Sequence, residues 1–174
     1  MKFADKMVKP EIRIPLYVLF NQLNKERTIT RRIKVLKEYN ERNHESGKLL
    51  RDYLQALYHP MVKLDLPDVP PPFKSEHEAF SAPLTLLKAL SKVKYFVKTH
   101  SEYISNVLKR ETIYIQILEG MSKDDADLYV SLLLKHFDTK KYPKLNIKTF
   151  YEALPEYFVG IDVEEIYEKE TAKK

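Results

Sequence analysis

The chain contains no cysteine, which excludes disulfide bonds, thiolate metal sites and a cysteine nucleophile. Glycine is almost as scarce, because Gly47, Gly120 and Gly160 are the only three among 174 residues. So few glycines argue against a Gly-rich phosphate-binding loop and against hairpins that depend on glycine turns. The lack of cysteine is compatible with a reducing cytoplasm.

Long apolar runs are also missing. The longest uncharged run near the N-terminus, residues 14–24, spans eleven residues and contains Asn21 and Gln22. Such a run is too short to cross a bilayer, and no small-residue cleavage site follows it. We therefore expect a protein that is not inserted in a membrane.

The residues that are present favour helices. A hydrophobic content of 44% with 32% charged residues is typical of a globular protein. No stretch shows the alternation of a β-strand, whereas apolar residues recur at helical spacing. The sequence predicts an all-α, compact single-domain bundle of about seven short helices, which we assign to residues 1–160, followed by an acidic C-terminal tail, residues 161–174. The expected helices begin near Ile14, Thr30, Gly47, Ser81, Ser101, Ser122 and Asn146.

A proline-rich segment, residues 61–74 (MVKLDLPDVPPPFK), separates the third and fourth expected helices. Its prolines forbid a helix and favour extended backbone. Its apolar side chains, such as Leu64 and Phe73, suit a strap that packs across the helices. The alternative is a proline-rich ligand for a partner domain, which would require those side chains to be exposed.

Glu111 lies within an otherwise apolar pattern. If residues 101–120 form one helix, Glu111 falls on the same stripe as Ile104, Leu108, Ile115 and Leu118. A carboxylate buried there needs a cationic or hydrogen-bonding partner. We therefore predict that Glu111 is a structural buried charge, with partners of the kind that Arg51 and Tyr53 offer.

Positive charge is concentrated in the N-terminal third, where residues 1–60 carry 13 basic and 7 acidic side chains. Two tracts lack acids altogether, residues 27–37 and residues 80–101. Exposed cations with an interleaved aromatic suit phosphates and an unpaired base. The alternative is an ordinary solvated helix surface. The predicted nucleic-acid-binding residues are Arg27, Arg31, Arg32, Lys34, Lys37, Lys88, Lys92, Tyr95 and Lys98.

No pattern of catalytic or metal-ligating residues is evident. The five histidines show no HExxH motif and no pairing at helical spacing, so we expect no metal and no cofactor. The serines lack a nucleophile-elbow context, and no second acid or base accompanies Glu111. We expect no enzymatic activity.

Three blocks of the chain, residues 58–74 (YHPMVKLDLPDVPPPFK), 108–126 (LKRETIYIQILEGMSKDDA) and 145–156 (LNIKTFYEALPE), carry a family resemblance. In this order they resemble a family of small uncharacterised proteins of T4-like tailed phages. The N-terminal thirty residues have no counterpart in that resemblance. It implies a phage protein that works in the cytoplasm of an infected bacterial host, and it implies no particular activity.

Together these features predict a non-enzymatic protein that acts by binding. Its expected partner is nucleic acid or host nucleoprotein machinery, contacted through the basic tracts. The alternative is a protein–protein adaptor or phage assembly factor, with the proline-rich segment as the contact surface.

Overall fold

The computed structural model describes residues 13–78 and 80–172, and within this part of the chain the regular structure is helical. Residues 1–12 of the predicted domain and residues 173–174 of the predicted tail lie outside it. The predicted all-α class is confirmed: the described residues hold eight α-helices, two 3-10 helices and an isolated bridge between His77 and Ser122. The helices are α1 (Leu16–Lys25), α2 (Ile29–Arg42), α3 (His44–Tyr58), α4 (Leu86–Leu90), η1 (Val93–Phe96), α5 (Val107–Gly120), α6 (Lys123–Leu134), α7 (Ile147–Ala153), η2 (Pro155–Phe158) and α8 (Val163–Ala172).

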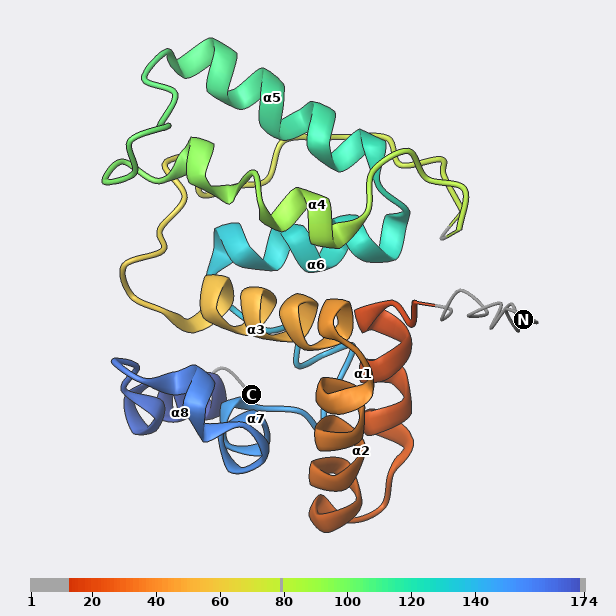
Figure 1. The fold of residues 1–174 in the computed structure, drawn as a ribbon. Helices are drawn as coiled ribbons and strands as arrows, with labels where there is room; N and C mark the ends of the chain where they lie inside the picture. The colour runs from red at the N-terminus through yellow and green to blue at the C-terminus, as the bar shows by residue number, and fades with distance from the viewer. Residues whose placement is uncertain (1–12, 79, 173–174) are drawn as a thin grey trace, which may run out of the picture.

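Helix α3 forms the centre of the molecule. It crosses the middle in Figure 1, with α4, α5 and α6 above it and α2, α7 and α8 below. It packs against α2, α4, α6 and η2, and it buries side chains on most of its circumference. Helix α3 therefore connects the helices on its two sides, α4–α6 on one side and α2, α7 and α8 on the other.

The core beside α3 is aromatic. Phe20 of α1 lies with its ring centroid 5.4–5.8 Å from four other rings, all in tilted or edge-on geometries that aromatic pairs prefer. These rings belong to Tyr53, Phe137, Tyr142 and Phe150. Because they come from α3, the segment after α6, and α7, the cluster ties distant parts of the chain to α1.

Side-chain caps define where most helices begin. Ser122 and Asn146 accept hydrogen bonds from the backbone N–H groups of Asp125 and Thr149, as the sequence predicts for α6 and α7. Three helices begin elsewhere than expected. Helix α2 begins after Thr28 instead of Thr30, α3 begins after Asn43 instead of near Gly47, and α5 begins after Asn106 instead of Ser101, because these side chains accept the first-turn N–H groups.

The helix expected from Ser81 onward is broken. Only Leu86–Leu90 is α-helical, and a 3-10 turn, Val93–Phe96, follows it. The carbonyl of Phe96 accepts a hydrogen bond from the backbone N of Asp65 at 2.7 Å, and that of Tyr95 accepts one from Ile104 at 3.0 Å. Tertiary contacts thus occupy the carbonyls that a longer helix would use.

The proline-rich strap, residues 61–74, contains no helix. Leu64 is buried at 4% exposure, and Val62, Leu66 and Phe73 are half-buried against the core. Met61 and Val69 are exposed at 64% and 76%. Most of the strap's apolar side chains therefore pack on the molecule itself.

The C-terminal segment differs from the predicted acidic tail. Residues 163–172 form α8, which packs on α7. Glu170 is only 4% exposed and accepts hydrogen bonds from the Tyr58 hydroxyl at 3.0 Å and from the backbone N of Ile147 at 2.9 Å. The described part of this segment is accordingly a docked helix, because one of its carboxylates has partners on two other helices.

Candidate functional site

Glu111 is not the buried charge of α5. It is half-buried, and the buried face of the helix consists of Arg110, Tyr114, Ile117 and Leu118. Leu108, which the predicted stripe placed in the core, is 75% exposed. The prediction for Glu111 is wrong because α5 is turned by about one residue, roughly 100°, relative to the predicted stripe. The predicted partners have other contacts, since Arg51 pairs with Asp52 and the Tyr53 hydroxyl contacts Ser131.

Arg110, the neighbour of Glu111, is the buried charge. It is 5% exposed, and its Nη2 lies 3.2 Å from the carboxylate of Asp65 in the strap. Its Nε donates to the Asp65 carbonyl at 2.7 Å, and its Nη1 donates to the carbonyls of Ile104 and Ser105 at 2.9 and 3.2 Å. The Tyr103 hydroxyl also donates to Asp65. This hydrogen bond and the Arg110 guanidinium hold the pKa of Asp65 below its ordinary value, although desolvation opposes them.

Little in the sequence indicates that Arg110 is buried, because a single arginine after a lysine is typical of an exposed helix surface. Its contacts are mainly with backbone carbonyls, which no side-chain pattern reveals. Its effect is structural: the guanidinium joins the strap to the loop before α5.

The first basic tract lies on and just before α2. Arg27, Arg31, Lys34 and Lys37 are exposed, and Arg32 is half-buried with its Nη2 donating to the Glu26 carbonyl at 3.3 Å. Arg31 and Lys34 form only long ion pairs, 3.5 Å to Glu26 and 4.0 Å to Glu38. Arg27 and Lys37 have no ion pair with any residue of 13–78 or 80–172. This tract presents unneutralised positive charge.

The second tract is dispersed over α4, η1 and the loop after them. Lys88 and Lys98 are exposed, whereas Lys92 and Tyr95 are half-buried. Lys98 lies 3.8 Å from Asp65, and the neighbouring Lys94 lies 2.7 Å from Glu102 and 5.6 Å from the centre of the Tyr95 ring. These contacts reduce the free charge of the tract and crowd the ring predicted to stack on a base.

The two tracts do not form one surface. Helices α2 and α4 both pack on α3, and Figure 1 shows them on opposite sides of it. The nine predicted residues are therefore divided into an α2 group and an α4–η1 group.

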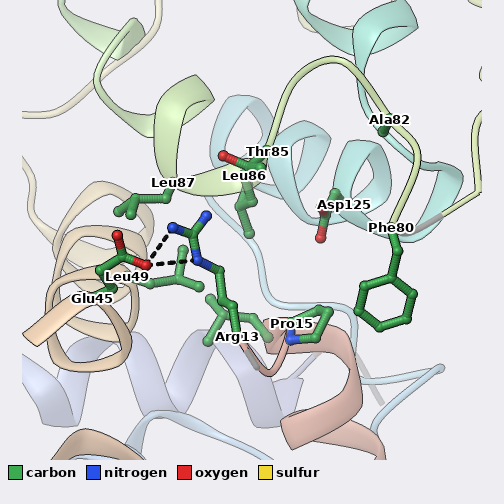
Figure 2. Close-up of a pocket in the computed structure, with 11 residues that line it drawn as sticks. Arg13, Pro15, Glu45, Leu49, Phe80, Ala82, Thr85, Leu86, Leu87 and Asp125 are labelled. Carbon is green, nitrogen blue, oxygen red and sulfur yellow. Dashed lines mark hydrogen bonds and ion pairs between the residues drawn. The ribbon is translucent and has the colours of Figure 1, made fainter. Parts of the chain in front are cut away.

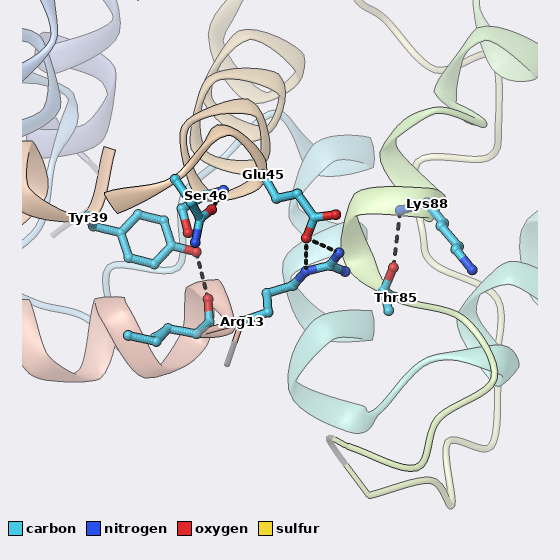
Figure 3. A network of polar contacts seen from close by, with 8 residues as sticks. Arg13, Tyr39, Glu45, Ser46, Thr85 and Lys88 are labelled. Carbon is cyan, nitrogen blue, oxygen red and sulfur yellow. Dashed lines mark hydrogen bonds and ion pairs between the residues drawn. The ribbon is translucent and has the colours of Figure 1, made fainter. Parts of the chain in front are cut away.

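A cavity of about 290 Å³ lies between the start of α1, the N-terminal half of α3, α4 and the first turn of α6. Figure 2 shows Asp125 of α6 on one side of it and the Arg13–Glu45 ion pair on the other. Arg13 Nε donates to Glu45 Oε2 at 3.1 Å. Figure 3 shows a further contact beside Arg13: the Tyr39 hydroxyl donates to the carbonyl of Ile14 at 2.6 Å.

Asp125 is the unusual group of this cavity. It is 8% exposed, and its Oδ1 has no hydrogen-bond partner among residues 13–78 and 80–172. Burial, with a smaller contribution from the charge of Asp124, raises the pKa of Asp125 to about 6, although hydrogen bonds with the backbone of Leu86 and the side chain of Ser122 oppose the shift. From the sequence, Asp125 is distinguished only by its place in the first turn of the helix expected to begin near Ser122.

Other kinds of site find no support in the described residues. The part of the chain at 13–78 and 80–172 holds no group of three or more His, Asp or Glu side chains placed to bind a metal ion. Within the same ranges, none of the helices combines the length and apolar character that crossing a membrane requires.

A family model described as a family of unknown function (DUF6433) matches residues 19–141. The match includes the first two of the three blocks noted in the sequence, at 58–74 and 108–126, and excludes the third. It also begins earlier than expected, since the first thirty residues had no counterpart in the resemblance. No curated protein and no solved structure matches the chain significantly.

Proposed function

The chain belongs to a family of unknown function, DUF6433, and we propose that it acts without catalysis, by binding nucleic acid through the outer face of α2. The resemblance of residues 58–74 and 108–126 to phage proteins supports a second part of the proposal. The protein would come from a tailed phage and work in the cytoplasm of the infected host, on nucleic acid or host nucleoprotein machinery.

One observation carries the proposal: three exposed cations lie on one side of α2, and Arg27 is exposed in the turn before it. Arg31, Lys34 and Lys37 follow one another at spacings of three residues along the helix, so successive side chains neighbour each other. The buried residues of α2, Leu36 and Tyr39, lie on the opposite side of the helix. This arrangement suits successive phosphates of a nucleic-acid backbone, and it offers no group that would read bases.

The proposal no longer includes Lys88, Lys92, Tyr95 and Lys98 in the same interface. They lie on the other side of α3, and the charge of Lys98 is partly neutralised by Asp65. If they contribute, they do so at a second, independent contact.

Fluorescence anisotropy with a labelled 20-nucleotide single strand and a duplex tests the proposal. The informative variant is Arg27→Gln/Lys37→Gln, which removes two exposed charges that have no ion pair among the described residues. The matched control is Lys123→Gln/Lys169→Gln, which removes two charges that are paired with Asp127 and Glu165. We expect the first variant to bind at least tenfold more weakly than the wild type at 50 mM salt, and the control to bind nearly normally. Equal losses in the two variants would show that only net charge matters.

A role as a protein–protein adaptor is the second candidate, and the exposure of Met61 and Val69 on the strap favours it. In this case a stoichiometric protein partner would remain bound after nuclease treatment. Met61→Ser/Val69→Ser would release that partner, while Arg27→Gln/Lys37→Gln would retain it. Retention of the partner by the strap variant would reject the adaptor surface.

A further inference from the structure

The cavity beside Asp125 has a polar side and an apolar side. Leu16 of α1, Leu49 of α3 and Leu86 of α4 contribute apolar wall, and Asp125 supplies a carboxylate. Figure 2 shows the Asp125 carboxylate directed into the space between these elements. At about 290 Å³ the cavity is just below the range of roughly 300–1,000 Å³ typical of ligand pockets, so any ligand is small.

One oxygen of the Asp125 carboxylate lacks the partner that burial demands, although the group has hydrogen bonds with the backbone of Leu86 and the side chain of Ser122. Asp125 is 8% exposed, and its Oδ1 receives no hydrogen bond from residues 13–78 or 80–172. A buried carboxylate is normally paired or hydrogen-bonded, because losing water without a replacement is unfavourable. Arg13 is the one cation among the described residues that line the cavity, and two of its nitrogens donate to Glu45.

The chemistry of the cavity selects one class of ligand. An anion would be repelled by the ionised carboxylate of Asp125. The guanidinium of Arg13 would not offset this repulsion, because it is already paired with Glu45. A metal ion would need several converging oxygens, and no such group exists in the described part of the chain. A guanidinium ligand prefers two parallel acceptors, whereas a single free oxygen suits the compact donor of an ammonium group.

We propose that this cavity binds a small alkylammonium ion, whose NH₃⁺ group donates to Asp125 Oδ1 and whose methylene chain lies against Leu16, Leu49 and Leu86. The site is separate from the cationic face of α2 and does not depend on the nucleic-acid proposal.

Binding of this kind depends on pH. The ammonium group requires the ionised form of Asp125, whose pKa is raised to about 6. The charged and titratable groups around it are Asp124 on the same helix, Tyr17 on α1, Tyr39 on α2, Arg13 before α1 and Glu45 on α3. Burial raises the pKa of both tyrosines above the ordinary value of 10, so neither changes charge between pH 5 and 7.5. The affinity should therefore fall about tenfold from pH 7.5 to pH 5, following the ionised fraction of Asp125.

The test uses the full chain, with n-butylammonium as the probe and n-butanol as its neutral counterpart. Calorimetry gives the affinity, and the ¹³C shift of the Asp125 carboxyl carbon reports its ionisation. We expect saturable 1:1 binding of butylammonium, weaker binding of butanol, and a lowered pKa of Asp125 in the complex. Absence of saturable binding, or equal affinity for the alcohol, overturns the proposal.

Two variants separate the site from general charge effects. Asp125→Asn should weaken binding at least tenfold, while Asp124→Asn, at a half-buried neighbour paired with Lys141, should leave binding nearly unchanged. Ala82→Leu should fill the cavity and abolish binding while Asp125 stays intact. Normal binding in the Ala82→Leu protein would place the ligand elsewhere and contradict the proposal.

An ammonium group could also come from a lysine side chain of another protein. A short lysine peptide with blocked ends distinguishes this source from a free amine. Peptide affinity no higher than that of butylammonium supports the small amine as the ligand. Much tighter binding of the peptide overturns the small-amine assignment in favour of a protein partner.

Discussion

Glu170 of α8 accepts a hydrogen bond from the backbone N of Ile147, the first residue of α7, at 2.9 Å. The carboxylate thereby satisfies one of the N–H groups that every helix leaves open in its first turn, and its charge is favourable at that end of the helix dipole. The Tyr58 hydroxyl donates to the same side chain, so α3, α7 and α8 meet at one buried group.

Replacement of Glu170 by alanine should destabilise the protein. The change leaves the Tyr58 hydroxyl and the Ile147 N–H buried without this acceptor, and a lost buried partner costs about 1–3 kcal/mol. Urea denaturation measures the free energy of unfolding. Glu168→Ala, an exposed change on the same helix, is the control and should shift the free energy by less than about 0.5 kcal/mol. Equal effects of the two changes would mean that α8 does not depend on Glu170.

Arg110 and Glu111 are neighbours in the sequence, but replacing each by alanine should destabilise the protein to very different extents. Arg110→Ala removes a 5% exposed guanidinium that bonds Asp65 and three carbonyls, and should cost about 3 kcal/mol. Glu111→Ala changes a half-buried side chain and should cost less than about 1 kcal/mol. Thermal and urea unfolding of both variants check the contrast. A larger loss for Glu111→Ala would restore the buried-carboxylate interpretation.

Asp125 should make the stability of the fold fall as the pH rises. Its pKa is about 6 in the folded protein against an ordinary value of 3.8, so the folded state holds more protons between these values. Stability from this group is therefore complete below about pH 4 and is lost as the pH rises through 6. Asp125→Asn should stabilise the protein at pH 7.5, by about 2 kcal/mol more than at pH 4. Urea denaturation at the two pH values gives the difference, and a pH-independent effect would contradict the raised pKa of Asp125.

Asp65 should behave in the opposite way. Its pKa is lowered by the Tyr103 hydroxyl and by Arg110, so its contribution to stability is present above its ordinary pKa and disappears as the pH falls through its folded pKa. Tyr103→Phe removes one of its donors and should raise the pKa of Asp65. NMR titration of the Asp65 carboxyl carbon measures this change. An unchanged pKa in the variant would show that the hydroxyl does not stabilise the charge.

Local signals predicted much of the fold from the sequence. Ser122 and Asn146 were correctly placed at the starts of α6 and α7, because a cap depends on residues three positions away. The all-α class followed from the same kind of local information. The end of this helical segment at Phe96 could not be predicted, since it depends on Asp65 and Ile104 donating to carbonyls of η1 from other parts of the chain.

The candidate sites were predicted less well, because they too depend on contacts between distant parts of the chain. The stripe through Glu111 assumed a helix that already included Ile104, whereas α5 starts at Val107 and buries the face of Arg110. The nine basic-tract residues were grouped by composition, which says nothing about α3 lying between α2 and α4. Asp125 could not be singled out from the sequence, because its burial depends on α1, α3 and α4 packing around it.

The central claim, that the exposed cations of α2 bind nucleic acid, is tested most directly by the salt dependence of binding to a 20-base-pair duplex. Four phosphate contacts predict a slope of roughly −3 to −4 in a plot of log K against log salt concentration. Arg27→Gln/Lys37→Gln should reduce the steepness by about 2, while Lys123→Gln/Lys169→Gln should leave it unchanged. A wild-type slope near zero, or the same slope in all three proteins, would contradict the claim.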